Sequence, residues 1–269
     1  MFILSTRYMN AKNSNNMLKI IYRIVICIAL IGAIYMFFRP IKTTEIVVAE
    51  AQAPIATAVT TAVTPITPEY QLPATVDGMA PVISVIPTKK NVVFLTIDDG
   101  GFKDESVVKI LAENHIKATL FLSKAFINNQ PDFFVQLQQQ GSIIEDHTLT
   151  HDTRMVKNQS YSQQKAEICG MSDYILEHYG HRPDLYRPPG GAYSNTMRKA
   201  AADCGIKAVV TWIATVNGGV MRYQIGNHLR PGDIVLMHFR PAFKQDINAF
   251  VNASKAAGLD IEVLENFIQ

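Results

Sequence analysis

The chain has 269 residues, of which 48% are hydrophobic and 18% charged, and its formal net charge is +2. This composition excludes a wholly disordered chain and allows one large packed domain or two small ones. The nearly balanced charge, without a run of basic residues, also argues against a nucleic-acid-binding protein.

The first element in chain order is an apolar stretch, residues 20–38, whose only charged residue is Arg23. A helix of this length spans roughly 28 Å, about the thickness of the hydrocarbon core of a bilayer. Basic residues are concentrated before the stretch, which favours residues 1–19 in the cytoplasm and the rest outside. We therefore predict a transmembrane signal anchor over 20–38, with translation starting at Met1 or Met17. A long signal peptide cut near residues 51–53, which would give a secreted protein, and a buried core helix are the alternatives.

Residues 39–90 are rich in Ala, Thr, Val and Pro. Proline fixes φ and removes a hydrogen-bond donor, so a segment of this composition favours an extended, semi-rigid backbone. The sequence therefore predicts a linker over 39–90 that separates the anchor from a globular domain over 91–269.

Strands and helices alternate in the predicted domain, which is typical of a parallel α/β sheet or barrel. Apolar runs predict strands over 92–97, 118–122, 142–145, 206–211 and 234–238. Helical spacing of apolar residues predicts helices over 104–114, 132–140, 161–179, 194–204 and 241–257. Ser160 is the expected N-cap of the longest helix, and Gly180 is its expected end.

Cys169 and Cys204 are the only cysteines of the predicted domain. We expect them to be two buried small hydrophobic residues. A disulfide between them, which would require an oxidising compartment, is the alternative.

Polar residues follow several of the predicted strands, in the motifs TIDDG, EDHTLTH, YRPPGG and IVLMHF: Asp98, Asp99, His147, His151, Arg187 and His238. In parallel α/β folds, catalytic groups gather where strands end. Two histidines and a carboxylate are a frequent ligand set for a divalent cation, with positions left open for water and substrate. The second carboxylate would then suit a general base, and His238 an acid. Each motif alone is compatible with a turn, a surface pair or a core histidine, but the combination favours a catalytic metal site.

In their order and spacing, these motifs resemble those of the polysaccharide deacetylases, the NodB-homology domain, over about residues 92–240. The resemblance implies a distorted (β/α) barrel. It also implies a metal-dependent hydrolase that cleaves the carbon–nitrogen bond of an N-acetylated sugar.

The resemblance implies a role for each matched residue. Asp99, His147 and His151 would bind a divalent metal, for which Zn²⁺ is the best match to imidazole and carboxylate ligands. Asp98 would be the general base, and Arg187 would hold it in place.

The remaining implied residues lie on the acid and substrate side of the site. His238 would protonate the leaving amine, and a backbone N–H near Gly190 would stabilise the oxyanion. Tyr193 and Trp212 are expected near the substrate, with Trp212 as a pocket wall.

The sequence departs from the family pattern at three positions. Gly190 stands where an aromatic residue is usual, Thr215 stands where an Asp is expected after Trp212, and Phe239 rather than Asp follows His238. We therefore expect an intact metal half of the site and an altered acid half.

The sequence thus predicts an N-acetyl deacetylase acting on a glycan that contains N-acetylglucosamine, such as peptidoglycan or a surface polysaccharide. The protein is expected to be a monomer with its catalytic domain anchored outside the cytoplasm and no nucleic-acid partner. The alternatives are a deacylase of a lipid-linked sugar, a catalytically impaired metal- and sugar-binding module, and an acetyl-ester hydrolase.

Overall fold

The computed structural model describes residues 69–269. The predicted cytoplasmic segment, the predicted anchor over 20–38 and most of the predicted linker lie outside these residues. Within the described part of the chain, no helix is long and apolar enough to cross a membrane.

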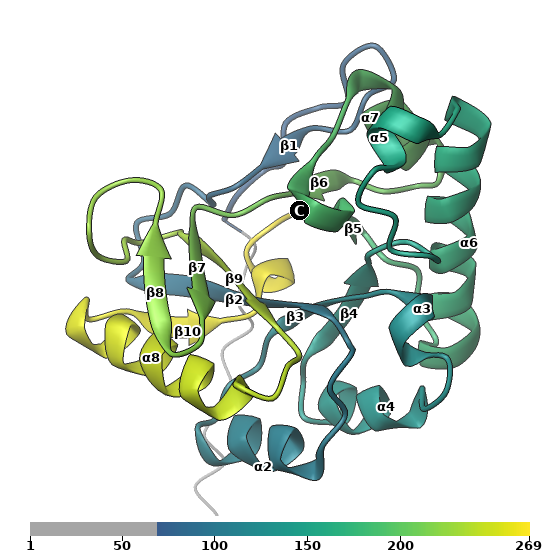
Figure 1. Ribbon diagram of the computed structural model, residues 1–269. Coiled ribbons are helices and arrows are strands. Elements are labelled where there is room, and N and C mark those ends of the chain that lie inside the picture. The colour runs from purple at the N-terminus through teal and green to yellow at the C-terminus, as the bar shows by residue number, and fades with distance from the viewer. Residues whose placement is uncertain (1–68) are drawn as a thin grey trace, which may run out of the picture. The chain divides into compact units, whose positions relative to one another are not determined.

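A curled sheet lies at the centre of the described residues, and helices cover its outer face (Figure 1). Its strands are β1 (Val82–Ile83), β2 (Val92–Asp99), β3 (Thr119–Leu122), β4 (Ile143–Asp146), β5 (Leu185–Tyr186), β6 (Ala208–Val210), β7 (Ala214–Asn217), β8 (Val220–Tyr223), β9 (Ile234–His238) and β10 (Asp260–Glu262).

The strand order is β1-β6-β5-β4-β3-β2-β9-β7-β8, and β10 pairs with the start of β2. The strands pair in parallel except in the β7–β8 hairpin, which is antiparallel. The expectation of an α/β fold is confirmed, but the sheet is a curled half-barrel that begins at β1 and ends at β8 rather than a closed barrel.

The helices are α2 (Glu105–Glu113), α3 (Lys124–Ile127), α4 (Asp132–Gln139), α5 (Met155–Asn158), α6 (Tyr161–Tyr179), α7 (Asn195–Asp203) and α8 (Phe243–Ala256). The predicted bounds of α6 are confirmed. Ser160 forms a capping box with Gln163, and Gly180 ends the helix with a φ of 79°.

The linker predicted over 39–90 is wrong in its last part, because residues 69–90 pack on the domain. β1 pairs in parallel with β6, and Leu72, Ile83 and Ile86 are buried in the hydrophobic cluster inside the curled sheet. Prolines at positions 73, 81 and 87 indicated an extended chain. An extended chain with prolines can still pack on a domain where its apolar side chains are buried in the hydrophobic core.

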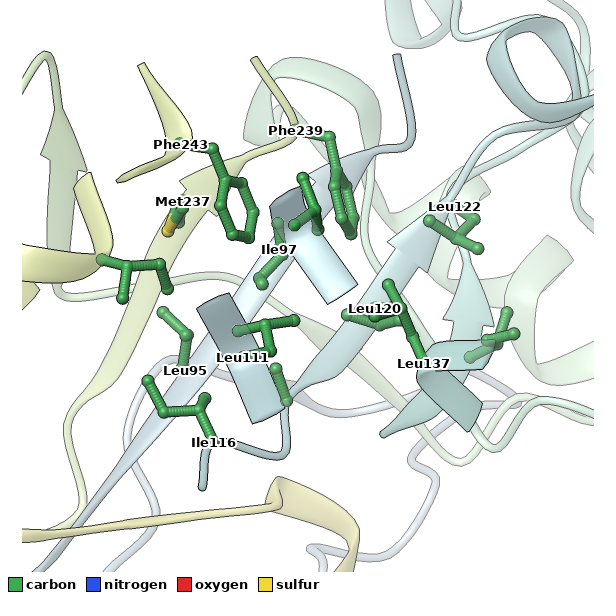
Figure 2. Packing of buried hydrophobic residues seen from close by; sticks show 14 of the residues in the cluster. Leu95, Ile97, Leu111, Ile116, Leu120, Leu122, Leu137, Met237, Phe239 and Phe243 are labelled. Carbon is green, nitrogen blue, oxygen red and sulfur yellow. The ribbon is translucent and has the colours of Figure 1, made fainter. Parts of the chain in front are cut away.

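Alternation along β2 divides the core into two layers. Leu95 and Ile97 join the outer layer between the sheet and the helices, together with Leu111, Leu137 and Phe243 (Figure 2). Val92 and Phe94 belong to the cluster inside the curled sheet, where Leu264 and Phe267 from the C-terminal segment also pack. At the far end of β2, the inner face carries Thr96 and Asp98 instead of apolar residues, which marks the position of the site.

Cys169 and Cys204 form a disulfide, so the expectation of two free buried cysteines is wrong. α6 carries Cys169, and Cys204 caps the end of α7, which packs against α6. Sequence spacing could not show this pairing, because it depends on how the two helices are packed.

Candidate functional site

The parallel sheet brings the predicted polar residues to one edge. Asp98 lies opposite His238 in the register of β2 and β9. Asp146 lies opposite Tyr186 in the register of β4 and β5, so His147 and Arg187 follow at the same level. Residues that are up to 140 positions apart in sequence therefore converge at the carboxyl ends of the strands.

Asp99, His147 and His151 form the predicted ligand set. Their ligand atoms all lie within 4.8 Å of one another. The Nε2 atoms of His151 and His147 lie 3.0 and 3.5 Å from Asp99 Oδ1. This oxygen is buried and accepts no hydrogen bond from the described residues, as expected of an atom that faces a cation. The donor set therefore fits a divalent metal such as Zn²⁺.

Two physical effects act on the carboxyl group of Asp99. Burial raises its pKa, but the facing imidazoles of His147 and His151 lower it by more. The net effect holds the pKa of Asp99 well below its usual range, so the group is ionised at neutral pH and can serve as a ligand.

The tautomer of His147 is fixed by its second ring nitrogen. Nδ1 lies 2.6 Å from the carbonyl oxygen of Arg187, and a carbonyl can only accept a hydrogen bond. Nδ1 therefore carries a proton, and Nε2 is the ring nitrogen available to a metal beside Asp99. Metal-binding histidines usually have such a partner, which orients the ring.

The loop after β4 brings the two histidines together through unusual backbone geometry. In the described residues, five non-glycine residues have a positive φ, and three of them are Asp99, Thr148 and His151. A φ of 72° is costly for a β-branched residue such as Thr148. Hydrogen bonds from Thr148 N to Asp146 Oδ1 and from His151 N to Thr148 Oγ1 hold the turn. Strained backbone of this kind is typical of functional sites.

The positive φ of Asp99 also explains how two adjacent carboxylates share one site. Consecutive side chains of a regular strand point to opposite faces of the sheet. Because Asp99 leaves the extended conformation, with a φ of 77°, both carboxylates approach His147. Asp98 Oδ2 lies 3.7 Å from His147 Nε2, close to the 3.5 Å found for Asp99 Oδ1.

Asp98 is held by Arg187, whose side chain is completely buried. Arg187 Nη1 donates to Asp98 Oδ1 and to Thr96 Oγ1, both at 2.7 Å. The guanidinium also donates to the carbonyls of residues 210 and 211 and lies 4.2 Å from the ring centroid of Phe121. With Oδ1 fixed in this way, Oδ2 is free to accept a proton on the side of His147.

His238 ends β9 and is partly buried. Burial lowers its pKa and Arg240 lowers it further, while Asp98 and Asp99 act in the opposite direction; the net shift is downward. No carboxylate of the described residues lies within 4.0 Å of its ring nitrogens. Thr215, at the position where an Asp was expected, lines a cavity of about 330 Å³ together with His238. In the described residues, the structure therefore places Thr215 and no carboxylate partner beside His238.

Phe239 does not enter the site. Its side chain points into the outer core layer, 5.5 Å from Phe134 and 5.7 Å from Phe243 between ring centroids (Figure 2). Phe239 therefore stabilises the fold instead of supporting His238.

The predicted substrate residues lie on another side of the site. Gly190 and Trp212 line a cavity of about 260 Å³, which agrees with Trp212 as a pocket wall. The indole also packs so closely on Gly191 that a Cβ there would lie 2.6 Å from Trp212 Cη2. Tyr193 does not line this cavity and is 45% exposed.

Sequence reasoning missed three residues that support the loop after β4. Asp146 accepts from Thr148 N and from Ser172 Oγ, and burial raises its pKa to about 8 despite these hydrogen bonds. Glu167 on α6 accepts from both the N–H and the hydroxyl of Thr150. Of these three residues, Asp146 could have been found from sequence, because it is an acidic residue directly before His147.

Residues 86–209 match the sequence profile of the family described as "Polysaccharide deacetylase". An uncharacterized protein of Streptomyces coelicolor is 39% identical over 159 residues, which are 58% of this chain and 63% of the relative. The peptidoglycan-N-acetylmuramic acid deacetylase PdaA of Bacillus subtilis is 25% identical over 163 residues, which are 56% of this chain and 61% of PdaA. The chain thus spans about six tenths of the length of these relatives.

Solved structures share the fold. The match to the structure of Bacillus subtilis PdaA covers 75% of this chain and 93% of the PdaA chain, with a TM-score of 0.57 and 20% identity. The match to the structure of a CE4 family pseudoenzyme from Bacillus anthracis covers 69% of this chain and 68% of the pseudoenzyme chain, with a TM-score of 0.59 and 18% identity. Residues 86–209 are therefore similar to the polysaccharide deacetylase family both in their sequence profile and in the order of the four motifs, and the solved structures share the fold of this chain.

Proposed function

We propose that the protein is a metal-dependent hydrolase that removes N-acetyl groups from a glycan containing N-acetylglucosamine, such as peptidoglycan. The observation that carries the proposal is the cluster of Asp99, His147 and His151 beside Asp98, whose second oxygen is left open by Arg187. PdaA, by its name, acts on an N-acetylated sugar of peptidoglycan, which supports the same class of substrate.

The roles of the residues follow from their positions. A divalent cation held by Asp99, His147 and His151 would polarise the amide carbonyl and acidify water. Asp98 Oδ2 would accept the proton of the attacking water, while Arg187 keeps the carboxylate in place. His238, opposite Asp98 in the sheet, would donate a proton to the leaving nitrogen.

We also propose that an N-terminal anchor holds the domain outside the cytoplasm. The apolar stretch over 20–38 supports an anchor, and the Cys169–Cys204 disulfide supports an oxidising compartment. A secreted form, produced by cleavage, is equally compatible with the disulfide.

The test is acetate release by the full-length, metal-loaded protein in detergent, with N-acetylated chitooligosaccharides and peptidoglycan strands as substrates. Asp98→Asn should keep the metal and lose about 10²–10⁴-fold in turnover, because it removes the base. His147→Ala should lose the metal. His228→Ala is the matched control, because His228 is exposed and bonds only to its neighbour Asn227 in the described residues.

A second candidate is a sugar-binding module without turnover, which is favoured by the absence, among residues 69–269, of a carboxylate partner for His238. The solved pseudoenzyme shows that the fold alone does not establish activity. This candidate predicts glycan binding without acetate release, and equal binding by the Asp98→Asn variant. Metal-loaded protein that releases no acetate from any N-acetylated glycan would overturn the deacetylase proposal.

A further inference from the structure

A basic cavity lies beside His238, between the β7–β8 hairpin and β9. It has a volume of about 330 Å³. The residues that line it are Thr215, Val216, Asn217, Arg222, Leu236, His238 and Arg240. Leu236 and His238 belong to the IVLMHF motif, and Thr215 stands at a position of the family pattern, whereas the other four residues lie outside the motifs discussed above.

The strand register explains why these side chains share one face. Thr215 lies directly opposite Arg222 in the antiparallel hairpin and pairs with Leu236 of β9. Directly paired residues point to the same side of a sheet, as do residues two positions apart. Asn217 and His238 therefore lie on the same face as Thr215 and Arg222.

Neither arginine of this cavity is neutralised within the described residues, where no carboxylate lies within 4.0 Å of Arg222 or Arg240. Arg240 Nη1 donates to Asn217 Oδ1 at 2.6 Å, while its Nε is buried without an acceptor. Because Thr215 is neutral where the family pattern has an Asp, the cavity carries positive charge only.

Three carboxylates of neighbouring elements do not pair with the arginines of the cavity. Asp98 binds Arg187, and Asp99 faces the imidazoles of His147 and His151. Asp246 of α8 is completely buried; its Oδ1 accepts from Gly219 N at 2.7 Å, and its Oδ2 is buried without a partner among the described residues. This bond ties the turn of the hairpin to α8.

We propose that this cavity binds an oxyanion, a carboxylate or a phosphate, carried by the sugar whose N-acetyl group is removed. Guanidinium groups bind both anions through paired, charge-assisted hydrogen bonds. The inference rests on the proposed function and refines it, because the cavity would select acidic amino sugars over neutral ones. Arg222 and Arg240 would then determine specificity, while the residues around Asp98 perform the chemistry.

Binding of single sugars to the full-length, metal-loaded protein tests the cavity without turnover. The probes are N-acetylmuramic acid with a carboxylate, N-acetylglucosamine 6-phosphate with a phosphate, and neutral N-acetylglucosamine, measured by calorimetry. We expect at least one acidic sugar to bind about tenfold more tightly than the neutral one, and the preference to weaken with salt. The tighter of the two identifies the anion.

Substitution then assigns the preference to the cavity. Arg222→Gln and Arg240→Gln should each reduce the preference about fivefold or more, whereas Arg182→Gln should retain it. Arg182 lies on the surface in an ion pair with Asp173 and serves as the matched control. Because Arg222 is exposed, its variant remains informative even if Arg240→Gln fails to fold.

Turnover separates failure of this inference from failure of the proposed function. We compare the ratio of kcat/KM for an acidic glycan to kcat/KM for a neutral glycan. This ratio should be about tenfold lower in the Arg222→Gln and Arg240→Gln variants than in the parent. No acetate from any glycan, with selective binding intact, would overturn the enzymatic proposal and keep the cavity. Equal binding of acidic and neutral sugars, or a preference that survives both substitutions, would overturn the cavity.

Discussion

The Cys169–Cys204 disulfide should contribute strongly to the stability of the domain. The two cysteines are 35 residues apart, and closing a loop of this length removes chain entropy worth roughly 4 kcal/mol from the unfolded state. For a domain of this size, 1 kcal/mol corresponds to about 2–4 °C in Tm. The double variant Cys169→Ala/Cys204→Ala should therefore melt about 8–16 °C below the parent.

The assay is thermal unfolding of the full-length protein with and without reductant, followed by circular dichroism. Reductant should lower the Tm of the parent to that of the double variant and leave the double variant unchanged. Both proteins retain Cys27, which controls for other effects of the reductant. The chain has three cysteines, so the denatured, unreduced parent should present one free thiol. Three free thiols and a Tm that is insensitive to reductant would refute the reasoning.

Two other predictions concern the site and its support. Replacing Arg240 by Gln removes a positive charge that lowers the pKa of His238. If His238 is the acid, the alkaline limb of the pH profile of acetate release should therefore move to higher pH. An unmoved limb would exclude His238 as the acid. Gly100→Ala should cost about 1–3 kcal/mol in urea unfolding, because Gly100 has a φ of 88° and an added Cβ would lie 2.4 Å from Ile127. Gly101→Ala is its control, since the nearest atom would be 3.8 Å away, and equal losses at both glycines would contradict the argument.

Much of the fold could be predicted because the longer elements carry strong local signals. The helix over 161–179 has a capping sequence at one end and a glycine at the other, and its bounds agree with α6. The strand endings that carry Asp98, His147, Arg187 and His238 meet as expected for parallel strands. Local sequence was sufficient here because burial, capping and periodicity all favour the same structure.

Short elements were missed because their stability comes from tertiary contacts. β1 has only two residues and depends on pairing with β6. The β7–β8 hairpin did leave a signal, since Gly218 and Gly219 both have a positive φ in its turn, and paired glycines between short strands are typical of hairpins. Gly100 leaves room for side chains of α3 and α4, since Ile127 and Phe134 lie closest to a Cβ added there, and only the structure shows this packing.

The cluster of Asp99, His147 and His151 could be predicted from sequence, whereas the surroundings of His238 could be predicted only in part. Asp99, His147 and His151 occur in short motifs whose chemistry is specific when combined. The surroundings of His238 instead depend on the pairing of β7 with β8 and β9, which brings Arg222 from another strand to face Thr215. Sequence could show that an aspartate was replaced, whereas the arginine opposite it became visible only in the structure.

The first and last residues of the described domain lie side by side, at the end of the sheet opposite the site. Tyr70 N donates to the carbonyl of Phe267, and Gln269 N donates to the carbonyl of Tyr70. This pair of segments closes the sheet at the amino ends of its strands, where Glu265 accepts from Thr119 at the start of β3. The site occupies the opposite ends. Residue 69 therefore enters the described domain at the amino ends of the strands, and the edge that carries Asp98 and His238 is left uncovered by this pair of segments.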